Sequence, residues 1–336
     1  MTRLLITGGA GFIGARLART LLARGTLAGR EIEQIVLADQ FAPPADLAAD
    51  PRVAALTGPL LEQCAGFAKE RFDGVFHLAS AVSGECELDF DLGMRSNLDS
   101  TRALLDALRA AGNAPRLLFS SSVAVFGPDP GKPLADIVAD DTLPAPQTSY
   151  GTQKLMCEHL IADMTRKGFI DGRAARLMTV TVRPGKPNAA ASSFFSGVIR
   201  EPLAGVASVC PVDASVSHPV SSPARTIEAL IAVYEATREQ LRGRLALNLP
   251  ALNVTVQQML DALEKVAGPK VRQHVVFRRD ERIAGIVANW PKGASAARAR
   301  ALGLGGDASF EDIIRQYIDD CRARPDAAAT LKGLDA

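Results

Sequence analysis

The loop that decides the fold reads Gly8-Gly9-Ala10-Gly11-Phe12-Ile13-Gly14, and it directly follows the apolar run Leu4-Leu5-Ile6-Thr7. A helical pattern comes next, so the loop joins a predicted strand to a predicted helix. Here Gly8 permits a tight turn, Gly11 lets the backbone approach a phosphate, and Gly14 allows close packing of helix on strand. The alternative is a glycine-rich turn that merely connects the two elements. The context predicts a dinucleotide site at the N-terminus of the helix.

Outward from this loop, short apolar runs alternate with helical patterns through the first half of the chain. Strand patterns occur at residues 35–38, 53–56, 75–78, 117–120 and 177–182, and the longest helical patterns at residues 91–111 and 149–167. Each pair of parallel strands needs a crossover connection, so the alternation predicts a doubly wound, Rossmann-type α/β fold. Ligand is expected at the carboxyl ends of its strands.

The pattern changes after Arg183-Pro184-Gly185, where loops rich in Pro, Ser and Ala separate short strand candidates from isolated helices. We expect residues 1–182 to form the nucleotide-binding domain. Residues 183–336 should form mainly a smaller α+β region that binds substrate, with some segments returning to the first domain. In this region Thr255-Val-Gln-Gln258 and Ser309-Phe-Glu-Asp312 have the form of capping boxes, which begin helices.

Composition excludes several functions. The chain has 336 residues, 47% of them hydrophobic, and its 38 basic and 37 acidic side chains leave a formal net charge of +1. Disorder and a general attraction to nucleic acid or an anionic membrane are therefore not expected. Five scattered cysteines, with no signal peptide or apolar span, predict a cytoplasmic protein with reduced thiols. Four scattered histidines without paired cysteines make a bound metal unexpected.

The predicted second strand ends at Asp39, about twenty-five residues beyond Gly14 and near the position of an acidic residue that holds an adenosine ribose. Its carboxylate can accept hydrogen bonds from both ribose hydroxyls but would repel a 2′-phosphate. The next residue is Gln40 rather than a compensating arginine. NAD is therefore favoured over NADP, and an ordinary loop carboxylate is the alternative.

Tyr150 and Lys154 stand four residues apart on a predicted helix, so their side chains share one face. Upstream, Ser120-Ser121-Ser122 ends a predicted strand at the sheet edge where the nicotinamide should lie. A phenol with a pKa near 10 is a poor base, but a neighbouring ammonium stabilises the phenolate. The pair alone is weak evidence. With the serine run it predicts a tyrosine base, a lysine that activates it and a serine that positions the substrate oxygen.

Six features in order resemble an extended short-chain dehydrogenase/reductase, within the NAD-dependent epimerase/dehydratase superfamily: Gly8-x-x-Gly11-x-x-Gly14, His77-Leu78-Ala79, Asn97, Ser120-Ser-Ser-Val-Ala-Val-Phe-Gly127, Tyr150-x-x-x-Lys154 and Arg183-Pro184-Gly185. The resemblance covers nearly the whole chain. It implies that Ser122 is the catalytic serine, beside Tyr150 and Lys154, which also contact the cofactor.

The resemblance also assigns further cofactor contacts. Phe12 and Ile13 would contact the pyrophosphate, Ala79 and Asn97 would line the cofactor, and the backbone near Pro184 would face the carboxamide. For Asn97 the alternative is a hydrogen bond to a helix neighbour. Gly58-Pro59-Leu60 departs from the Gly-Asp-Leu usual in the family. Pro59 offers adenine no side-chain acceptor, although the backbone up to Leu60 remains available.

Further segments resemble the D-erythronate dehydrogenase branch, among them Pro146-Gln-Thr-Ser-Tyr150, Arg200-Glu-Pro-Leu-Ala-Gly205 and Asn248-Leu-Pro250. This implies NAD-dependent oxidation of the C2 hydroxyl of D-erythronate, or a similar four-carbon sugar acid, to a 2-keto acid. Water elimination is disfavoured because Val123-Ala124, rather than an acidic pair, follows Ser122. An NAD-containing sugar-nucleotide epimerase stays open, as does a non-catalytic NAD-binding sensor.

A small anionic substrate requires a cation and hydroxyl-binding groups in the pocket. Arg225 is the first candidate for the carboxylate, followed by Lys186 and His218, and the candidates for the hydroxyls are Ser83, Asn188 and Ser192. The alternatives are that Arg225 pairs within its helix, His218 is a loop histidine and Arg183 is a structural cation. We expect His77 to be structural. The helices over 91–111 and 149–167 cover the sheet or form an interface, and the resemblance favours a homodimer.

Overall fold

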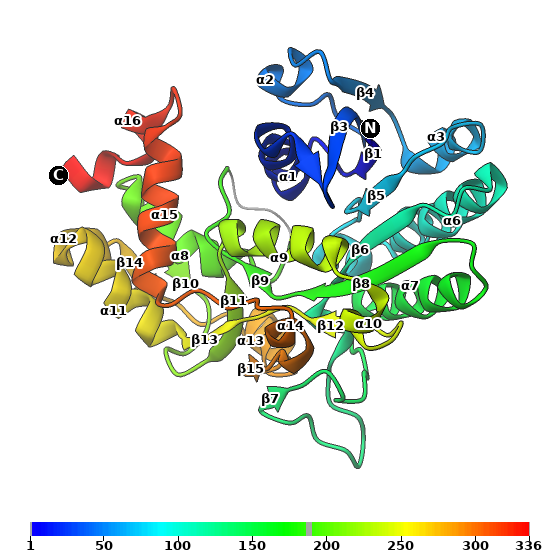
Figure 1. Cartoon of the computed structure of the whole chain (residues 1–336). Helices are drawn as coiled ribbons and strands as arrows, with labels where there is room; N and C mark the ends of the chain where they lie inside the picture. The colour runs from blue at the N-terminus through cyan, green and yellow to red at the C-terminus, as the bar shows by residue number, and fades with distance from the viewer. Residues whose placement is uncertain (1, 186–189, 336) are drawn as a thin grey trace.

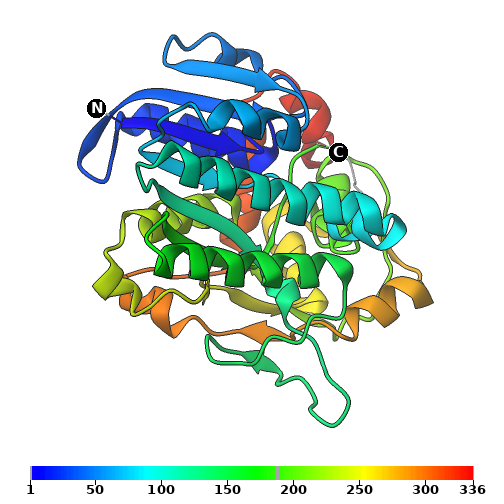
Figure 2. The same ribbon diagram turned by 90° about the vertical axis from the view of Figure 1, so that its right-hand side faces the viewer.

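The computed structural model describes residues 2–185 and 190–335, within which the largest sheet has eight strands (Figures 1 and 2). Seven strands are parallel in the order β4-β3-β1-β5-β6-β8-β12, and β2 is antiparallel to β3. Their bounds are β1 Thr2–Thr7, β2 Thr26–Leu27, β3 Arg30–Asp39, β4 Val53–Thr57, β5 Gly74–His77, β6 Arg116–Ser122, β8 Asp171–Leu177 and β12 Leu247–Asn248. The chain runs outward from β1 and then crosses back to β5, so the order reverses between these strands. This doubly wound sheet confirms the predicted fold class, and ligands bind such sheets at the point of reversal.

Helices cover both faces of the sheet. On one face α1 (Phe12–Arg24) packs against α9 (Pro223–Glu235), and the apolar core below them also contains Leu247 and Ala299. On the other face lie α3 (Leu60–Phe67), α6 (Ser100–Ala111) and α7 (Ser149–Arg166), with α6 and α7 side by side (Figure 2). Because α9 and β12 come from beyond residue 182, the first layer includes segments of the second half of the chain.

Most of the second half of the chain forms a region of its own (Figure 1). This region has a separate apolar core, which includes Val182 and Phe195. Its strands are β9 Thr179–Val180, β11 Ser217–Ser221 and β13 Leu252–Thr255 in one sheet, the pair β10 Ser208–Cys210 and β14 Val275–Phe277, and β15 Gly293–Ala294 beside β7 Ile137–Val138. Its helices are α8 Ser193–Leu203, α10 Arg238–Leu241, α11 Val256–Ala267, α12 Pro269–Arg272, α13 Glu281–Val287, α14 Ala297–Ala301, α15 Phe310–Arg322, α16 Ala327–Thr330 and a 3₁₀ turn Lys332–Asp335. The division at residue 182 stays a prediction.

The predicted helix over 91–111 is confirmed, with a local change of winding. It comprises α5 (Phe90–Gly93), a π-helical turn (Met94–Asp99) and α6. Two short helices precede these elements, α2 (Ala45–Ala48) and α4 (Ser83–Leu88), and a 3₁₀ turn (Val123–Val125) follows β6. Among residues 2–185 and 190–335, no helix combines the length and apolarity that a membrane span requires.

One of the two expected capping boxes forms completely. The Thr255 hydroxyl accepts the Gln258 N–H at 3.1 Å, and the Gln258 side chain accepts the Thr255 N–H at 2.8 Å. At the second helix start, Ser309 accepts the Asp312 N–H at 3.1 Å, but the Asp312 carboxylate accepts from the Ser309 hydroxyl. Asp is one methylene shorter than Glu, and here only the forward half of the box forms.

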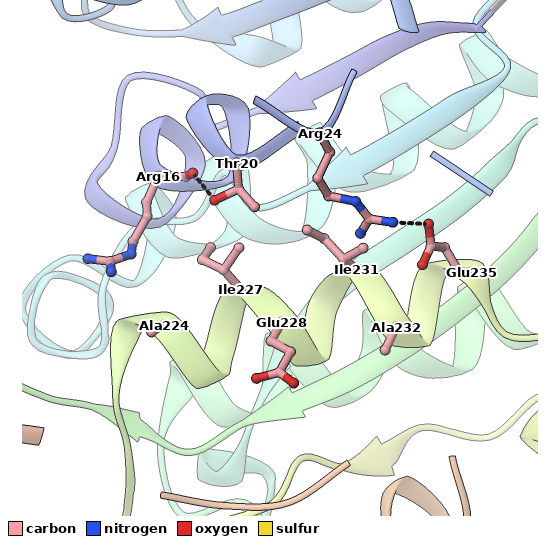
Figure 3. A pocket seen from close by; sticks show the side chains of 9 residues that line it. All are labelled: Arg16, Thr20, Arg24, Ala224, Ile227, Glu228, Ile231, Ala232 and Glu235. Atoms are coloured by element: carbon pink, nitrogen blue, oxygen red, sulfur yellow. Dashed lines mark hydrogen bonds and ion pairs between the residues drawn. The ribbon is translucent and has the colours of Figure 1, made fainter. Parts of the chain in front are cut away.

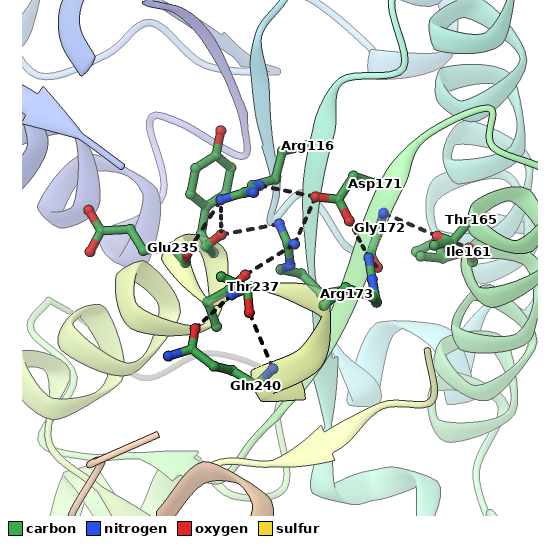
Figure 4. Close-up of polar contacts among 12 residues, drawn as sticks. Arg116, Ile161, Thr165, Asp171, Gly172, Arg173, Glu235, Thr237 and Gln240 are labelled. Atoms are coloured by element: carbon green, nitrogen blue, oxygen red, sulfur yellow. Dashed lines mark hydrogen bonds and ion pairs between the residues drawn. The ribbon is translucent and has the colours of Figure 1, made fainter. Parts of the chain in front are cut away.

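A charged cluster fastens the second half to the amino edge of the sheet (Figure 4). Asp171, at the start of β8, accepts hydrogen bonds from Arg116 at 3.1 Å, Arg173 at 2.9 Å and also Arg238. Arg116 and Arg173 also donate to the carbonyl of Tyr234 at the end of α9. Burial lowers the pKa of Arg173 to about 10. This end of the strands is therefore occupied by structural charges, and the opposite edge is where a ligand is expected.

Candidate active site

The glycine loop leaves no space for side chains at two of the three predicted positions. At Gly8, where φ is +70°, a Cβ would lie 2.8 Å from the backbone nitrogen of Ala79. At Gly14 a Cβ would lie 2.1 Å from the carbonyl oxygen of Gly8. Gly11 precedes α1 and is exposed, so its backbone is open to a ligand at the helix N-terminus. This cradle has the form that a pyrophosphate requires.

Asp39 ends β3 beside this loop, and its carboxylate also holds the loop in place. One oxygen accepts the Ala10 N–H at 3.0 Å, and the other accepts the Phe41 N–H at 3.1 Å. A carboxylate has about four acceptor positions, so further capacity remains for ribose hydroxyls. The sequence did not indicate the bond to Ala10, which makes Asp39 part of the cradle.

A buried chain of hydrogen bonds positions Ala79. The Thr101 hydroxyl donates to the Asn97 carbonyl at 2.5 Å, so it accepts from Nε2 of His77 at 2.8 Å. Nδ1 of His77 then accepts from the Thr7 hydroxyl at 2.7 Å, whose oxygen accepts the Ala79 N–H at 3.3 Å. Burial lowers the pKa of His77 to about 3, so the ring stays neutral. His77 is thus structural, as predicted, and it joins β5 to α6 and β1.

The buried side chain of Asn97 is held by protein groups on both its oxygen and its nitrogen. Its Oδ1 accepts from the Ala81 N–H at 2.7 Å and the Ser80 hydroxyl at 3.0 Å, and its Nδ2 donates to Gln153 at 2.8 Å. These partners bind both its oxygen and its amide group. That Asn97 also lines the cofactor stays a prediction. Asn97 is a positioning residue that ties the loop after β5 to α7.

The predicted catalytic residues meet at the carboxyl edge of the sheet. Ser122 is the last residue of β6, and its Oγ accepts the Ala124 N–H at 3.1 Å. Tyr150 lies in the first turn of α7, and Lys154 follows one turn later, 2% exposed. The Lys154 ammonium donates to the Ser120 carbonyl at 2.8 Å and lies 5.6 Å from the centroid of the Tyr150 ring. The ammonium of Lys154 is thus fixed beside the ring of Tyr150.

Gly151 allows α7 to approach the serine turn, and the sequence analysis missed it. A Cβ at Gly151 would lie 2.1 Å from the carbonyl oxygen of Ala124. The helix begins with a Thr148 cap, whose hydroxyl accepts the Gly151 N–H at 3.0 Å. The sequence does contain a sign of this contact, because a glycine directly follows Tyr150. The missing side chain at Gly151 determines how closely Tyr150 can stand beside Ser122.

A buried ion pair holds α7 against β6 and β8. Nε and Nη2 of Arg176 donate to the two carboxylate oxygens of Glu158 at 2.9 and 2.8 Å. The hydroxyl of Ser121 donates to the same carboxylate. Glu158 lies one turn after Lys154 on the same helix face, so this contact fixes the lysine's register on the sheet. No motif in the sequence pointed to Glu158 or Arg176.

The other predicted cofactor residues lie at element ends. Phe12 and Ile13 open α1, where backbone N–H groups lack helical partners. Leu60 opens α3 after Pro59, on the neighbouring part of the same sheet edge. Pro184 lies after β9 and is partly buried. These positions stay predictions of contact.

The predicted substrate residues lie on several different elements. Ser83 opens α4, and Ser192 precedes α8, where its hydroxyl accepts from Arg183 at 3.4 Å. Arg225 lies on α9 with its guanidinium paired to Glu228 at 2.6 Å on the exposed helix face. Lys186 and Asn188 lie outside the described residues.

His218 is corrected as a substrate ligand. The ring is 2% exposed and stacks on Phe195, and Nε2 contacts the Thr179 hydroxyl at 2.8 Å. Nδ1 lies 3.2 Å from the carbonyl oxygen of Pro291. Burial lowers the pKa of His218 to about 4, so it carries no charge for a carboxylate at neutral pH. In the sequence His218 follows a run of loop residues, and this local pattern did not indicate that the side chain would lie in the core as part of β11.

Two hollows on the surface contain none of the three catalytic residues. One is a groove between α1 and α9, with Arg24 bonded to Glu235 across it at 2.8 Å (Figure 3). The other adjoins the start of α7 and includes Phe90 and Met156. The five cysteines are buried and unpaired. Within residues 2–185 and 190–335, no cluster of three or more potential metal ligands occurs.

Together, the cradle and the serine, tyrosine and lysine side chains define a nicotinamide-dependent oxidoreductase that acts on CH–OH groups. Residues 4–215 match the model of the NAD dependent epimerase/dehydratase family, and the chain belongs to this family. The cofactor is NAD: Gly8 and Gly14 let the loop pack tightly at the N-terminus of α1, where a pyrophosphate binds, and Asp39 supplies acceptors for its ribose.

Close relatives cover almost the whole chain. A curated D-erythronate dehydrogenase from Cupriavidus necator is 49% identical over 324 residues, which are 94% of this chain and 98% of that protein. One from Haemophilus influenzae is 42% identical and covers 94% of this chain and 99% of that protein. A solved structure, described as a nucleoside-diphosphate-sugar epimerase from Agrobacterium tumefaciens, is 42% identical, covers 95% of this chain and 94% of that one, and has a TM-score of 0.89. The resemblance to extended short-chain dehydrogenases is therefore confirmed.

Proposed function

We propose that this protein is a D-erythronate dehydrogenase that oxidises the C2 hydroxyl of D-erythronate, or a closely related four-carbon sugar acid, with NAD. The observation that carries this proposal is the buried Lys154 ammonium, fixed on the Ser120 carbonyl beside the ring of Tyr150. The two relatives with this activity, which align over 94% of the chain, support the choice of substrate.

In this proposal Tyr150 is the general base. Lys154 stabilises its phenolate, Ser122 orients the C2 hydroxyl by a hydrogen bond, and the phenolate accepts the hydroxyl proton. NAD supplies the hydride acceptor, so the C2 hydrogen leaves with its electron pair. The products are a 2-keto acid, NADH and a proton. A serine and a neutral tyrosine alone would leave the substrate alcohol without a group to take its proton at neutral pH.

The test is NADH formation with a panel of four-carbon sugar acids, including D-erythronate, and with neutral polyols. We expect turnover with D-erythronate. A Tyr150→Phe variant should lose at least about a thousandfold in kcat while still binding NADH. Tyr317→Phe, the same change on α15, should stay within about twofold. Turnover by Tyr150→Phe at the original rate would reject Tyr150 as the base, and no turnover of any sugar acid by the wild type would reject the substrate class.

A sugar-nucleotide epimerase is the second candidate, because the Agrobacterium structure, 42% identical, is described as one. Such an enzyme would interconvert two sugar nucleotides without net NADH release and would retain its cofactor through purification. Incubation with nucleotide sugars, followed by chromatography of the products, distinguishes the two. Product interconversion without NADH would favour the epimerase.

We also propose a cytoplasmic homodimer. Leu88 at the end of α4 is 86% exposed and Phe90 in α5 is 61% exposed, and Met156 on α7 is exposed near them. Large apolar side chains gathered on adjoining elements favour contact with another protein surface. An enzyme that reduces NAD needs access to the NAD of the cell, and this supports the cytoplasmic location.

A further inference from the structure

A four-carbon sugar acid places strict limits on where its binding cation can lie. Its carboxylate is attached to the carbon that the reaction oxidises, so the cation must stand within a few ångströms of the base. This step rests on the proposed function. His218 is buried and neutral, and Arg225 is paired with Glu228 on an exposed helix face. Neither meets the requirement.

Arg183 lies just beyond the carboxyl edge of the sheet, the edge at which Ser122 and the first turn of α7 meet. In the main sheet Leu177 of β8 is the direct partner of Ser122, and Arg183 follows six residues later, after β9. The charges of Arg183 and Tyr150 interact: burial lowers the pKa of the arginine, and the tyrosine raises it. The guanidinium is therefore within electrostatic reach of the phenol.

The backbone and side chain of Arg183 are held in one geometry. Its Nε donates to the Val180 carbonyl at 3.0 Å and its Nη2 to the Ser192 hydroxyl at 3.4 Å. Its N–H donates to Ser196 at 3.0 Å, and its carbonyl accepts from Arg200 at 2.9 Å. A guanidinium has five N–H groups. Two are used here, so among the described residues three remain without a partner, enough for a carboxylate.

Arg183, which is partly buried, differs from the buried arginines in its charge balance. Arg173 pairs with Asp171, Arg176 with Glu158 and Arg200 with Glu201, each at 3.0 Å or less. No carboxylate among the described residues forms an ion pair with Arg183. A charge that is partly withdrawn from solvent and has no counterion is suited to receive an ion of opposite charge.

We propose that Arg183 binds the substrate carboxylate, with the Ser192 hydroxyl beside it, and so selects sugar acids over neutral sugars. The fork of the guanidinium matches the two oxygens of a carboxylate. Anchored there, the acid presents its adjacent C2 hydroxyl to Ser122 and Tyr150. From the sequence alone, Arg183 was expected only as a structural cation.

The experiment compares D-erythronate with its neutral amide, which keeps the C2 hydroxyl and loses the charge. Binding of each to the enzyme–NADH complex is measured by calorimetry for the wild type and for Arg183→Met, Arg183→Lys and Arg166→Met. We expect the wild type to prefer the acid, and Arg183→Met to weaken acid binding about a hundredfold while changing amide binding less than threefold. Arg183→Lys keeps the positive charge but loses the forked guanidinium. Its affinity for the acid should therefore lie between those of the wild type and Arg183→Met. Arg166→Met, an exposed arginine on α7, should match the wild type.

A purely structural arginine would affect acid and amide equally, and that result, or no loss in Arg183→Met, overturns the assignment. So does equal wild-type affinity for acid and amide, or loss of acid selectivity in Arg225→Met instead. The proposed function is judged separately by NADH formation. A wild type that binds D-erythronate through Arg183 but forms no NADH refutes that function and keeps the anion site. A wild type that binds no sugar acid refutes both.

Discussion

At the scale of single residues, the active site depends on absent side chains as much as on present ones. Gly151 lies against the Ala124 carbonyl, and this contact sets the distance between α7 and the turn that follows Ser122. The spacing of the catalytic residues therefore depends on the absence of a side chain at Gly151. Chemical motifs alone do not reveal such a condition.

Gly151→Ala should push the first turn of α7 away from the serine turn. We expect a loss of about 1–3 kcal/mol in the free energy of unfolding and a fall of about 10- to 100-fold in kcat, because a small displacement disturbs the reacting geometry. Urea unfolding and steady-state kinetics measure the two effects. Gly66→Ala in α3 is the control: its Cβ would meet no atom within 4 Å, and we expect unchanged kinetics and equal or greater stability. Wild-type values for Gly151→Ala would contradict the steric argument.

The two buried histidines predict a pH dependence of stability. Burial lowers the pKa of His77 to about 3 and of His218 to about 4, against about 6.5 in the unfolded chain. Between pH 6.5 and pH 4 the unfolded state therefore binds more protons than the folded state. The stability due to keeping these rings neutral is fully present above pH 6.5 and is lost as the pH falls toward 4.

The measurement is the free energy of unfolding at several pH values between 7 and 4.5. The slope against pH should be smaller in His218→Gln than in the wild type, whatever the variant's stability at pH 7. His159→Gln, which removes an exposed histidine from α7, serves as the control and should leave the slope as it is. An identical slope in His218→Gln and the wild type would show that His218 does not contribute.

At the scale of secondary-structure elements, α7 carries three functions on successive turns. Tyr150 is the proposed base, Lys154 is fixed on β6, and Glu158 is bonded to Arg176 on β8. The helix is thus joined to two strands through charged, buried contacts. Its exposed face carries ordinary ion pairs such as Arg166 with Asp163.

Glu158→Gln should be strongly destabilising, because it leaves the buried Arg176 without its counterion. We expect a loss of about 3–5 kcal/mol in the free energy of unfolding, measured with urea. Asp163→Asn, which breaks the exposed pair on the same helix, should cost less than about 1 kcal/mol. The double variant Glu158→Gln/Arg176→Met should recover part of the loss. Equal effects of the two single variants would contradict the importance of burial.

The sequence predicted elements best where one local pattern determined them. Helix α15 follows from the spacing of Phe310, Ile313, Ile314, Tyr317 and Ile318, which are all buried. The glycine loop and α7 were found for the same reason. By contrast, the place of β12 beside β8 depends on pairing across more than seventy residues. Such pairing leaves no trace in a local pattern.

The site residues, too, could be predicted where a local pattern identifies them and not where distant segments determine their contacts. Tyr150, Lys154 and Ser122 were recognised because their spacing is chemical and local. His218 was misjudged because its burial depends on Phe195 and Thr179, which other segments bring to it. Arg183 was undervalued because an unpaired charge can be identified only once the positions of possible partners are known. Contacts between distant segments therefore account for both misjudgements.

At the scale of the whole molecule, the exposed apolar residues on α4, α5 and α7 predict a dimer. Phe90→Ser with Leu88→Ser should convert it to a monomer, which light scattering coupled to gel filtration would measure. Leu245→Ser removes an exposed apolar side chain elsewhere and should leave the mass unchanged. A monomeric wild type at micromolar concentration would contradict the prediction.

The positions of α9 and β12 in the first layer have a consequence for folding during synthesis. α9 covers one face of the cofactor sheet and β12 forms its edge, yet a ribosome translates both only after residue 222. A nascent chain that ends near residue 182 would expose the apolar surface that Ile227 and Leu230 later cover. Residues 1–182 alone would therefore lack a helix that covers their sheet and the strand at its edge. The sheet is complete only after about three-quarters of the chain has been synthesised, because β12 ends at Asn248.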